Sequence, residues 1–424
     1  MIISFSVRNF KSLRNEITLH MGVANTDDIH SNNIAFFEKN KRQVLRTAGI
    51  WGPNASGKSN LLEALGALWS LVSFSHKNDL DEHIKEYKPF RLDQHDQMPV
   101  FFELDFIANN KEHYIYSVEF LKDKILSERL EYYASIKASV LFERKDAGTG
   151  ESSLRFSKKL KGGKASIKYL TNQCFLSVAG NTGGTSDLIT NAYRYIRSNI
   201  NIFSTKTSIL ARNILQNEQY LQLLSKLLHC ADTGIDHIKS REHQNFDFLN
   251  LPPDMPDEVK KQIYDDFRWQ PLFFHNNSRV EFSIKDESQG TKRLYNISPL
   301  LLLGLASNEV FIFDELDSQL HFKLVEMIIR MFHDKKINGQ NPQLIFTCHN
   351  TALMDQDLLR RDQIWFTQKD ANGITELSCL DEYEQVRSDT NFEKWYREER
   401  FDAVPEVNYS ELRNIIAEYV RGVN

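Results

Sequence analysis

Residues 52–59 read GPNASGKS, which matches the pattern G-x-x-x-x-G-K-[ST] that forms phosphate-binding loops. The stretch before it, TAGIWG (47–52), is short and apolar and predicts a buried strand. The stretch after it places leucines at helical spacing and predicts a helix from about residue 59 to residue 74. Because strand, loop and helix follow one another in the order that this pattern requires, we expect an α/β fold of the P-loop type.

Each position of this loop has a chemical purpose. Small residues allow the backbone N–H groups to turn inward around a phosphate, and the N-terminus of the helix adds the positive end of its dipole. Lys58 is expected to reach the β- and γ-phosphate oxygens, and Ser59 to ligate Mg²⁺. The sequence therefore predicts ATP and Mg²⁺ as ligands. The candidate nucleotide-binding residues of the loop are Asn54, Ala55, Ser56, Gly57, Lys58, Ser59 and Asn60.

A second stretch, EVFIFDEL (309–316), consists of apolar β-forming residues that end in two acids. The carboxyl end of a buried parallel strand faces the ligand crevice, so we expect Asp314 to hold Mg²⁺ and Glu315 to polarise the attacking water. Adjacent acids after a strand also occur as the cap of the next helix. For this stretch taken alone, a helix cap explains the two acids as well as a catalytic role does. Together with the phosphate loop, the two acids favour an ATPase that converts ATP and water to ADP and phosphate.

The composition excludes several classes of protein. The 424 residues include 52 Lys and Arg against 57 Asp and Glu, so the chain does not coat nucleic acid through overall basicity. The four cysteines lie far apart without a C-x-x-C pair, which indicates reduced thiols and a cytoplasmic protein rather than a disulfide framework or a zinc site. The longest apolar runs are shorter than the roughly 18 residues of a membrane span, so we expect no membrane helix.

One local patch could still bind nucleic acid. Residues 155–168 read RFSKKLKGGKASIK and gather basic side chains around a Gly-Gly turn. Lys158, Lys159 and Lys161 are the candidates for a contact with DNA or RNA. The alternative is a solvated hairpin tip, because single basic hairpins are common and few aromatic residues stand among these lysines.

The remaining pattern divides the chain into four parts. Two alternating runs, 100–108 and 113–121, are joined by a polar turn and predict an antiparallel sheet that extends to about residue 178. From residue 186 the period becomes helical, and after a proline-rich linker at 251–258 strand and helix signals alternate. We expect an N-terminal ATPase lobe (1–180), a helical lid or arm (181–264), a C-terminal ATPase lobe (265–380) and a C-terminal helical extension (381–424).

The residues around the second acid resemble a known superfamily. Glu315 directly follows the strand Asp, LDSQLH (316–321) comes next, and QLIFTCHN (343–350) forms the following strand signal. This order is similar to the ABC-type ATPase heads of the RecF, SMC and OLD superfamily. The resemblance implies an ABC-type P-loop NTPase head, with a mixed sheet plus an antiparallel lobe and an inserted helical subdomain. It also implies that Glu315 is the catalytic base and that His349 senses the γ-phosphate.

Heads of this kind also carry a signature motif, a Ser and a Gly at a helix N-terminus that bind the γ-phosphate held by the other subunit. ESQGTKRLY (287–295) resembles its S-x-G-T form, so the resemblance assigns this role to Ser288 and Gly290. Without the family context, a Ser-x-Gly before a helix is an ordinary cap. The family also has a Q-loop glutamine, for which Gln94 and Gln97 are both candidates.

A wider likeness covers nearly the whole chain. Small bacterial ATPases of the abortive-infection type contain similar motifs in the same order, and the chain resembles RloA and the ATPase subunits of PARIS- and Septu-like anti-phage systems. The segment RFDAVP departs from the RFGxxP form that this group would have. The matching segments are NFKSL (9–13), PFRLD (89–93), ADTGIDHI (231–238), ESQGTKRL (287–294), the acidic strand EVFIFDEL (309–316), LRRDQIWF (359–366) and RFDAVP (400–405).

This likeness implies a mode of action. The signature motif lies on the surface opposite the phosphate loop, so two subunits would sandwich two ATP molecules in a head-to-tail homodimer, which could be part of a larger homo-oligomer. The dimer would control a separately encoded, nuclease-like effector in anti-phage defence. The alternative is a RecF-like nucleotide-gated DNA clamp or scaffold with negligible turnover. A nuclease within the chain is disfavoured, because only 75 residues follow His349 and they contain no Asp-x-Asp pair after a strand.

Overall fold

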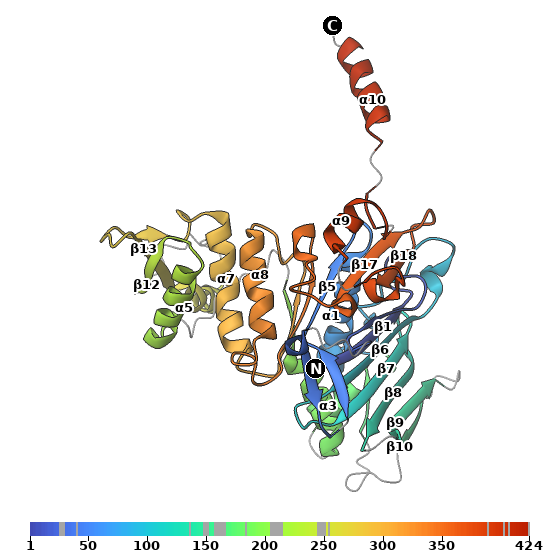
Figure 1. Ribbon diagram of the computed structural model, residues 1–424. Helices are drawn as coiled ribbons and strands as arrows, with labels where there is room; N and C mark the ends of the chain where they lie inside the picture. Colours follow the sequence, from blue (N-terminus) through green and yellow to red (C-terminus); the bar gives the residue numbers. More distant parts are fainter. Residues whose placement is uncertain are drawn as a thin grey trace.

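The computed structural model describes most of the chain. The described residues are 1–24, 30–39, 41–134, 137–146, 152–156, 167–182, 185–203, 215–243, 252, 255–387, 390–401, 403–405 and 408–422. Within them, an antiparallel lobe and a mainly parallel sheet lie side by side, and a smaller module extends from the parallel sheet (Figure 1).

The antiparallel lobe is a sheet in the order β10-β9-β8-β7-β6-β1-β2. The predicted hairpin at 100–121 is confirmed as β6 and β7, which pair along their whole length. The expectation that the sheet reaches residue 178 is wrong, because its last strand ends at Phe156 and the helix α2 spans Phe175–Asn181. The strands are β1 (Ile2–Arg8), β2 (Ile17–His20), β6 (Val100–Ile107), β7 (His113–Phe120), β8 (Ile125–Tyr133), β9 (Ser139–Asp146) and β10 (Ser152–Phe156).

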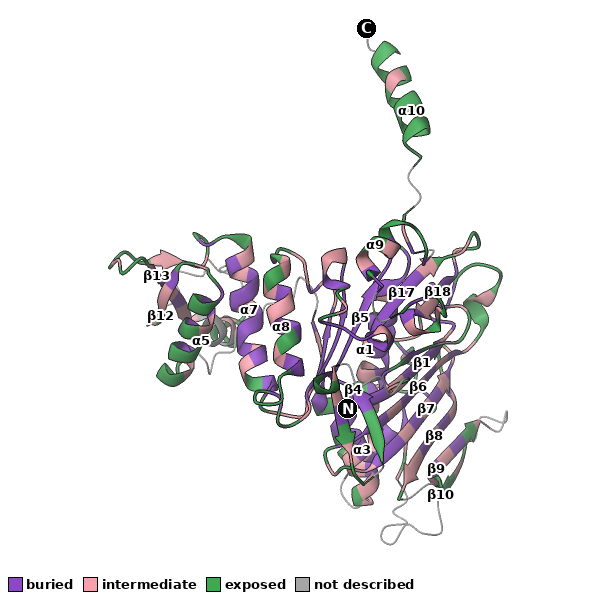
Figure 2. Cartoon of the chain, in the orientation of Figure 1, coloured by how far each residue is buried: buried purple, intermediate pink, exposed green. Residues whose placement is uncertain are grey.

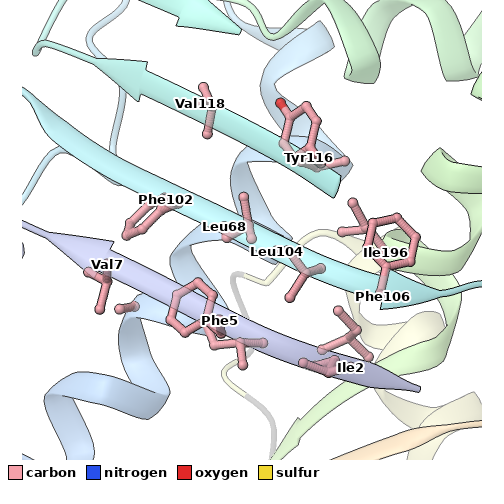
Figure 3. Close-up of a cluster of buried hydrophobic side chains, with 14 of the residues drawn as sticks. Ile2, Phe5, Val7, Leu68, Phe102, Leu104, Phe106, Tyr116, Val118 and Ile196 are labelled. Carbon is pink, nitrogen blue, oxygen red and sulfur yellow. The ribbon is translucent and has the colours of Figure 1, made fainter. Parts of the chain in front are cut away.

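The core of this lobe forms because the strands alternate apolar and polar residues. Alternate side chains of a strand point to the same face, so β1 places Phe5 and Val7 beside Phe102 and Leu104 of β6. Figure 3 shows these side chains together with Leu68 of the helix α1, which spans Lys58–Phe74. The phosphate-loop helix is therefore held by the antiparallel lobe.

The second sheet has the order β11-β15-β16-β5-β17-β18, and all of its pairs except β17–β18 are parallel. Its central strands are short apolar runs whose residues are all buried, as expected for strands covered on both faces. The predicted strand before the phosphate loop is confirmed, and so is the parallel sheet. The strands are β5 (Thr47–Trp51), β11 (Ile200–Phe203), β15 (Val310–Phe313), β16 (Gln343–Thr347), β17 (Ile364–Lys369) and β18 (Thr375–Cys379).

Residues 181–264 are not wholly helical. Their first helix, α3 (Asp187–Asn199), packs on α1 and α2, and the strand β11 that follows pairs with β15 in the central sheet. The sequence INIF of β11 is too short to show a period of two. The helical pattern on either side of it therefore led to the prediction of a helical segment. This part of the chain therefore contributes to the head itself.

The smaller module lies beside α7 (Figure 1, left). The helix α5 of this module packs on the strand β12 and on the neighbouring helix α7. These contacts bury the apolar stripe of α5. The elements of this region are α5 (Glu218–Cys230), β12 (Ile235–Glu242), α6 (Asp257–Phe267), β13 (Trp269–His275), β14 (Phe282–Ser283), α7 (Gln289–Gly304) and α8 (Phe322–His333).

One glutamine joins the two lobes. The Gln343 side chain at the start of β16 accepts a hydrogen bond from the Ile2 N–H at 2.8 Å and donates to the Ile2 carbonyl at 2.9 Å. It also donates to the Leu45 carbonyl at 3.0 Å, so one buried amide connects β1, β16 and the strand β4 (Arg42–Leu45), which pairs with β3 (Ile34–Phe37). Because an unpaired buried amide is costly, these bonds fix the two lobes relative to each other.

The C-terminal segment contains two helices of different character. The short helix α9 (Phe392–Arg397) is anchored by the buried Phe392 and Tyr396, whereas α10 (Tyr409–Gly422) projects from the head with its large apolar side chains exposed (Figure 2). No helix among the described residues is long and apolar enough to cross a membrane.

Candidate functional site

The phosphate loop connects β5 to α1, as its sequence predicts. Gly57 has φ 114° and a Cβ there would overlap the Thr375 side chain, so the loop needs a glycine at this position. The loop borders a cavity of about 270 Å³. The lining residues are Asn54, Ala55, Ser56, Gly57, Lys58, Ser59 and Asn60 of the loop and helix start, with Glu315, His349 and Lys369.

Lys58 lies within this cavity with its stem buried. Its Nζ donates to the carbonyls of Gly52 at 2.7 Å and Pro53 at 2.9 Å, which holds the ammonium over the loop. Burial lowers the pKa of Lys58, while the nearby carboxylates of Asp314 and Glu315 act in the opposite direction. The ammonium therefore stays close to both the loop and the acids.

The acid end of β15 meets the start of α1. Ser59 Oγ donates to Asp314 Oδ1 at 3.0 Å, and Thr347 Oγ1 at the end of β16 donates to the same oxygen at 2.8 Å. These oxygens form a hard donor set of the kind that Mg²⁺ prefers, so the residues fit the predicted metal. The structure thus brings together two metal-site candidates that lie on opposite halves of the sequence.

Glu315 follows Asp314 in a left-handed backbone conformation. It has φ 53°, and its N–H donates to Thr347 Oγ1 at 2.7 Å, so the threonine hydroxyl binds both acid residues. The Glu315 side chain is half-exposed, and its Oε1 lies 3.9 Å from His349 Nε2. The carboxylate and the imidazole therefore stand together at the mouth of the cavity.

Asp317 fixes the backbone of this histidine. Its Oδ2 accepts hydrogen bonds from the N–H groups of His349 at 3.0 Å and Asn350 at 2.9 Å. The turn after β15 is thus tied to the turn after β16. This link keeps His349 beside Glu315.

The signature candidates lie elsewhere. Ser288 is the N-cap of α7, where its Oγ accepts a hydrogen bond from the Thr291 N–H at 3.1 Å, and neither Ser288 nor Gly290 lines the cavity. A Cβ at Gly290 would come within 2.9 Å of the Gln319 carbonyl, so glycine allows α7 to approach the segment after β15. Within one subunit both residues have a local structural role.

Two further groups of candidates come from the sequence, the Q-loop glutamines and the lysines of the basic patch. Gln94 and Gln97 are both exposed, at the N-cap and at the last residue of the short 3₁₀ helix η3 (His95–Gln97), and neither is among the residues that line the cavity. Lys158, Lys159 and Lys161 lie outside the described residues. The choice between the glutamines and the role of the basic hairpin therefore remain predictions.

Sequence reasoning missed the hairpin of β17 and β18, which lies directly against the phosphate loop. Thr367 Oγ1 is hydrogen-bonded to Ser56 Oγ at 2.6 Å, and Thr375 Oγ1 donates to the Ser56 carbonyl at 2.7 Å. The hairpin also contributes Lys369 to the lining of the cavity. The available signal was the spacing of Thr367 and Lys369 in WFTQK, which places both on one face of a strand.

The chain matches a known protein family. Residues 48–164 and 187–355, more than half of the chain, match the model of the family described as "AAA domain, putative AbiEii toxin, Type IV TA system". The match spans the phosphate loop, both acids and the histidine. No curated protein matches the chain significantly.

Solved structures with a related arrangement have low sequence identity. An SMC head bound to the C-terminal winged-helix domain of ScpA is 12% identical, with TM-score 0.43, and the match covers 91% of this chain and 99% of that one. The SMC head of Thermotoga maritima is 13% identical, with TM-score 0.39 and coverage of 89% and 98%. The recombination mediator RecF is 14% identical, with TM-score 0.36 and coverage of 89% and 98%.

Proposed function

The chain belongs to the AAA-domain family whose description names the AbiEii toxin, and from this membership we propose that it binds and hydrolyses ATP to control a separately encoded effector. The observation that carries the proposal is the hydrogen bond between Ser59 and Asp314 beside the phosphate loop. It joins the residues that would bind the phosphates to those that would promote hydrolysis.

Nucleotide binding depends on the loop and α1. The backbone N–H groups of the loop and the helix N-terminus attract the phosphates, and Lys58 supplies positive charge to their oxygens. Ser59 and Asp314 would hold Mg²⁺, and Thr347 keeps the Asp314 carboxylate in position through its 2.8 Å hydrogen bond. When bound, Mg²⁺ neutralises charge on the β- and γ-phosphate oxygens.

Hydrolysis depends on Glu315. Its carboxylate accepts a proton from water as the water attacks the γ-phosphate, a role for which its half-exposed position at the cavity mouth is suitable. His349, 3.9 Å away, contacts the same reacting region and responds to the presence of the γ-phosphate.

Assembly would complete the site. Ser288 and Gly290 stand outside the cavity of their own subunit, and the exposed N-terminus of α7 suits binding of a γ-phosphate held by another copy. We therefore include an ATP-sandwiched homodimer in the proposal.

The cellular role that we propose is the control of a separate effector protein. The family description refers to a putative toxin of a toxin–antitoxin system. The role in anti-phage defence is part of our proposal and comes from the resemblance of the sequence motifs to those of abortive-infection ATPases. The effector that we propose is a nuclease-like protein encoded separately.

The test is to measure ATP binding and phosphate release by the full chain, with Lys58→Ala as the control. Binding and turnover that both depend on Lys58 would support the proposal. Binding without turnover would indicate a nucleotide-gated clamp instead, and absence of binding would refute both.

A further inference from the structure

We propose that Lys369 is a second cationic residue of the phosphate site, and that it binds the polyphosphate of the nucleotide from the side opposite Glu315 and His349. The inference rests on the proposed nucleotide binding and adds a residue that none of the sequence motifs includes.

The sheet order gives the site two walls. β16 and β15 lie on one side of β5, and β17 lies on the other side and is parallel to β5. The carboxyl ends of parallel strands form the ligand edge of such a sheet, and Lys369 is the last residue of β17. Glu315 and His349 therefore border the cavity from the β15–β16 side, and Lys369 borders it from the β17 side.

The pleat of the strand directs Lys369 toward the loop. Side chains two residues apart point to the same face, and Thr367 on that face is hydrogen-bonded to Ser56 Oγ at 2.6 Å. Thr375 is the cross-strand partner of Lys369, and it donates to the Ser56 carbonyl at 2.7 Å. Lys369 thus shares its face with two side chains that already contact the phosphate loop.

The hairpin holds this position firmly. At its turn, Asp370 Oδ1 accepts hydrogen bonds from the N–H groups of Asn372 at 2.9 Å and Ile374 at 2.7 Å. Directly after the turn, Ser12 connects Thr375 to Asn60, with 2.7 Å to Thr375 Oγ1 and 2.6 Å to Asn60 Nδ2. The backbone of Lys369 is therefore fixed relative to Ser56 of the loop and to Asn60 at the start of α1.

The charges of the cavity leave a role for a second cation. Lys58 is the cation of the loop, whereas Asp314 and Glu315 both bring negative charge to the same site. Within the part of the chain that the structure describes, Lys369 is exposed and makes no ion pair, so its ammonium can move to a bound anion without breaking one. A polyphosphate, with its high charge density, is the ligand class that such a lysine recognises.

The experiment measures the affinity of the full chain for a non-hydrolysable ATP analogue, ADP and AMP by calorimetry. Lys369→Ala should weaken binding of the ATP analogue on the order of tenfold, ADP less and AMP least, because fewer phosphate charges remain. Lys369→Arg should retain most of the affinity, and the loss in Lys369→Ala should shrink at high salt.

Two matched variants control for other causes. Gln368→Ala changes the opposite face of the same strand, where Gln368 contacts Glu376 at 2.9 Å, and Lys336→Ala removes a lysine that does not line the cavity. Both should bind all three ligands like the wild type.

The outcomes separate this inference from the proposed function. If the wild type binds nucleotide and Lys369→Ala binds it equally well, or loses the same factor for all three ligands, Lys369 is not a polyphosphate ligand while the ATPase proposal stands. If the wild type binds no nucleotide, both proposals fail.

Discussion

Ser59 and Asp314 are 255 positions apart in the sequence, and their side chains are hydrogen-bonded at 3.0 Å. This bond joins the first turn of α1 to the end of β15, two elements in different halves of the chain. Since Thr347 donates to the same Asp314 oxygen at 2.8 Å, the carboxylate is already oriented by two hydroxyl groups. The site is thus organised by contacts between distant segments.

The first prediction concerns metal use. Asp314→Asn replaces one carboxylate oxygen by an amide nitrogen, which is a poor Mg²⁺ ligand, so turnover should fall strongly and need more Mg²⁺. A titration of phosphate release against Mg²⁺ measures both effects. An unchanged Mg²⁺ dependence would place the metal elsewhere.

A second prediction separates binding from hydrolysis. Glu315→Gln retains the size of the side chain but cannot accept the proton, so ATP should still bind while hydrolysis falls on the order of 10²–10⁴-fold. Sedimentation with ATP and Mg²⁺ should then detect an accumulated dimer. Normal turnover together with an unshifted monomer would contradict the role assigned to Glu315.

The sequence allowed part of this site to be predicted. The loop motif and the Asp-Glu pair predicted Ser59, Asp314 and Glu315, which the structure brings to one place, because short strands and glycine loops have strong local patterns. Thr375 could not be found in this way, since its contact with Ser56 depends on how a distant hairpin packs.

The limits of the fold prediction have a similar cause. The strand β11 was missed because four residues cannot show a period, and its identity as a strand depends on pairing with β15. The strands β6 and β7 could be predicted because their alternation of apolar and polar residues continues over eight residues each.

A third prediction tests whether the β17–β18 hairpin positions the loop. Thr375→Val retains the shape but removes the hydroxyl that donates to the Ser56 carbonyl and pairs with Ser12, leaving buried polar groups unpaired. We expect a loss of about 1–3 kcal/mol in the free energy of unfolding and weaker ATP binding. Thr375→Ser is the control, because it keeps the hydroxyl and should restore the affinity for ATP. If Thr375→Val binds ATP like the wild type, or if Thr375→Ser loses as much affinity as Thr375→Val, the hydroxyl is not the group that positions the loop.

The last prediction concerns a site shared between subunits. Ser288→Arg places a large charged side chain at the N-terminus of α7, outside the cavity of its own subunit. Each subunit should therefore still bind ATP through Lys58 but fail to hydrolyse it, because the γ-phosphate shell would lack the hydroxyl and N–H groups of the opposite chain. Nucleotide titration and phosphate release measure the two properties separately.

Mixing two inactive variants then distinguishes a shared site from a helix cap. A Lys58→Ala subunit has an intact Ser288, and a Ser288→Arg subunit has an intact loop, so their heterodimer contains one complete site and one site that lacks both elements. Phosphate release that reappears on mixing would mean that each site is built from two chains. Heterodimers that form but stay inactive would refute a shared site that works on its own. Either hydrolysis then needs both sites of the dimer at once, or Ser288 has only a local role as a helix cap. Full activity of Ser288→Arg alone would show that Ser288 serves only as the cap that its 3.1 Å bond to the Thr291 N–H describes.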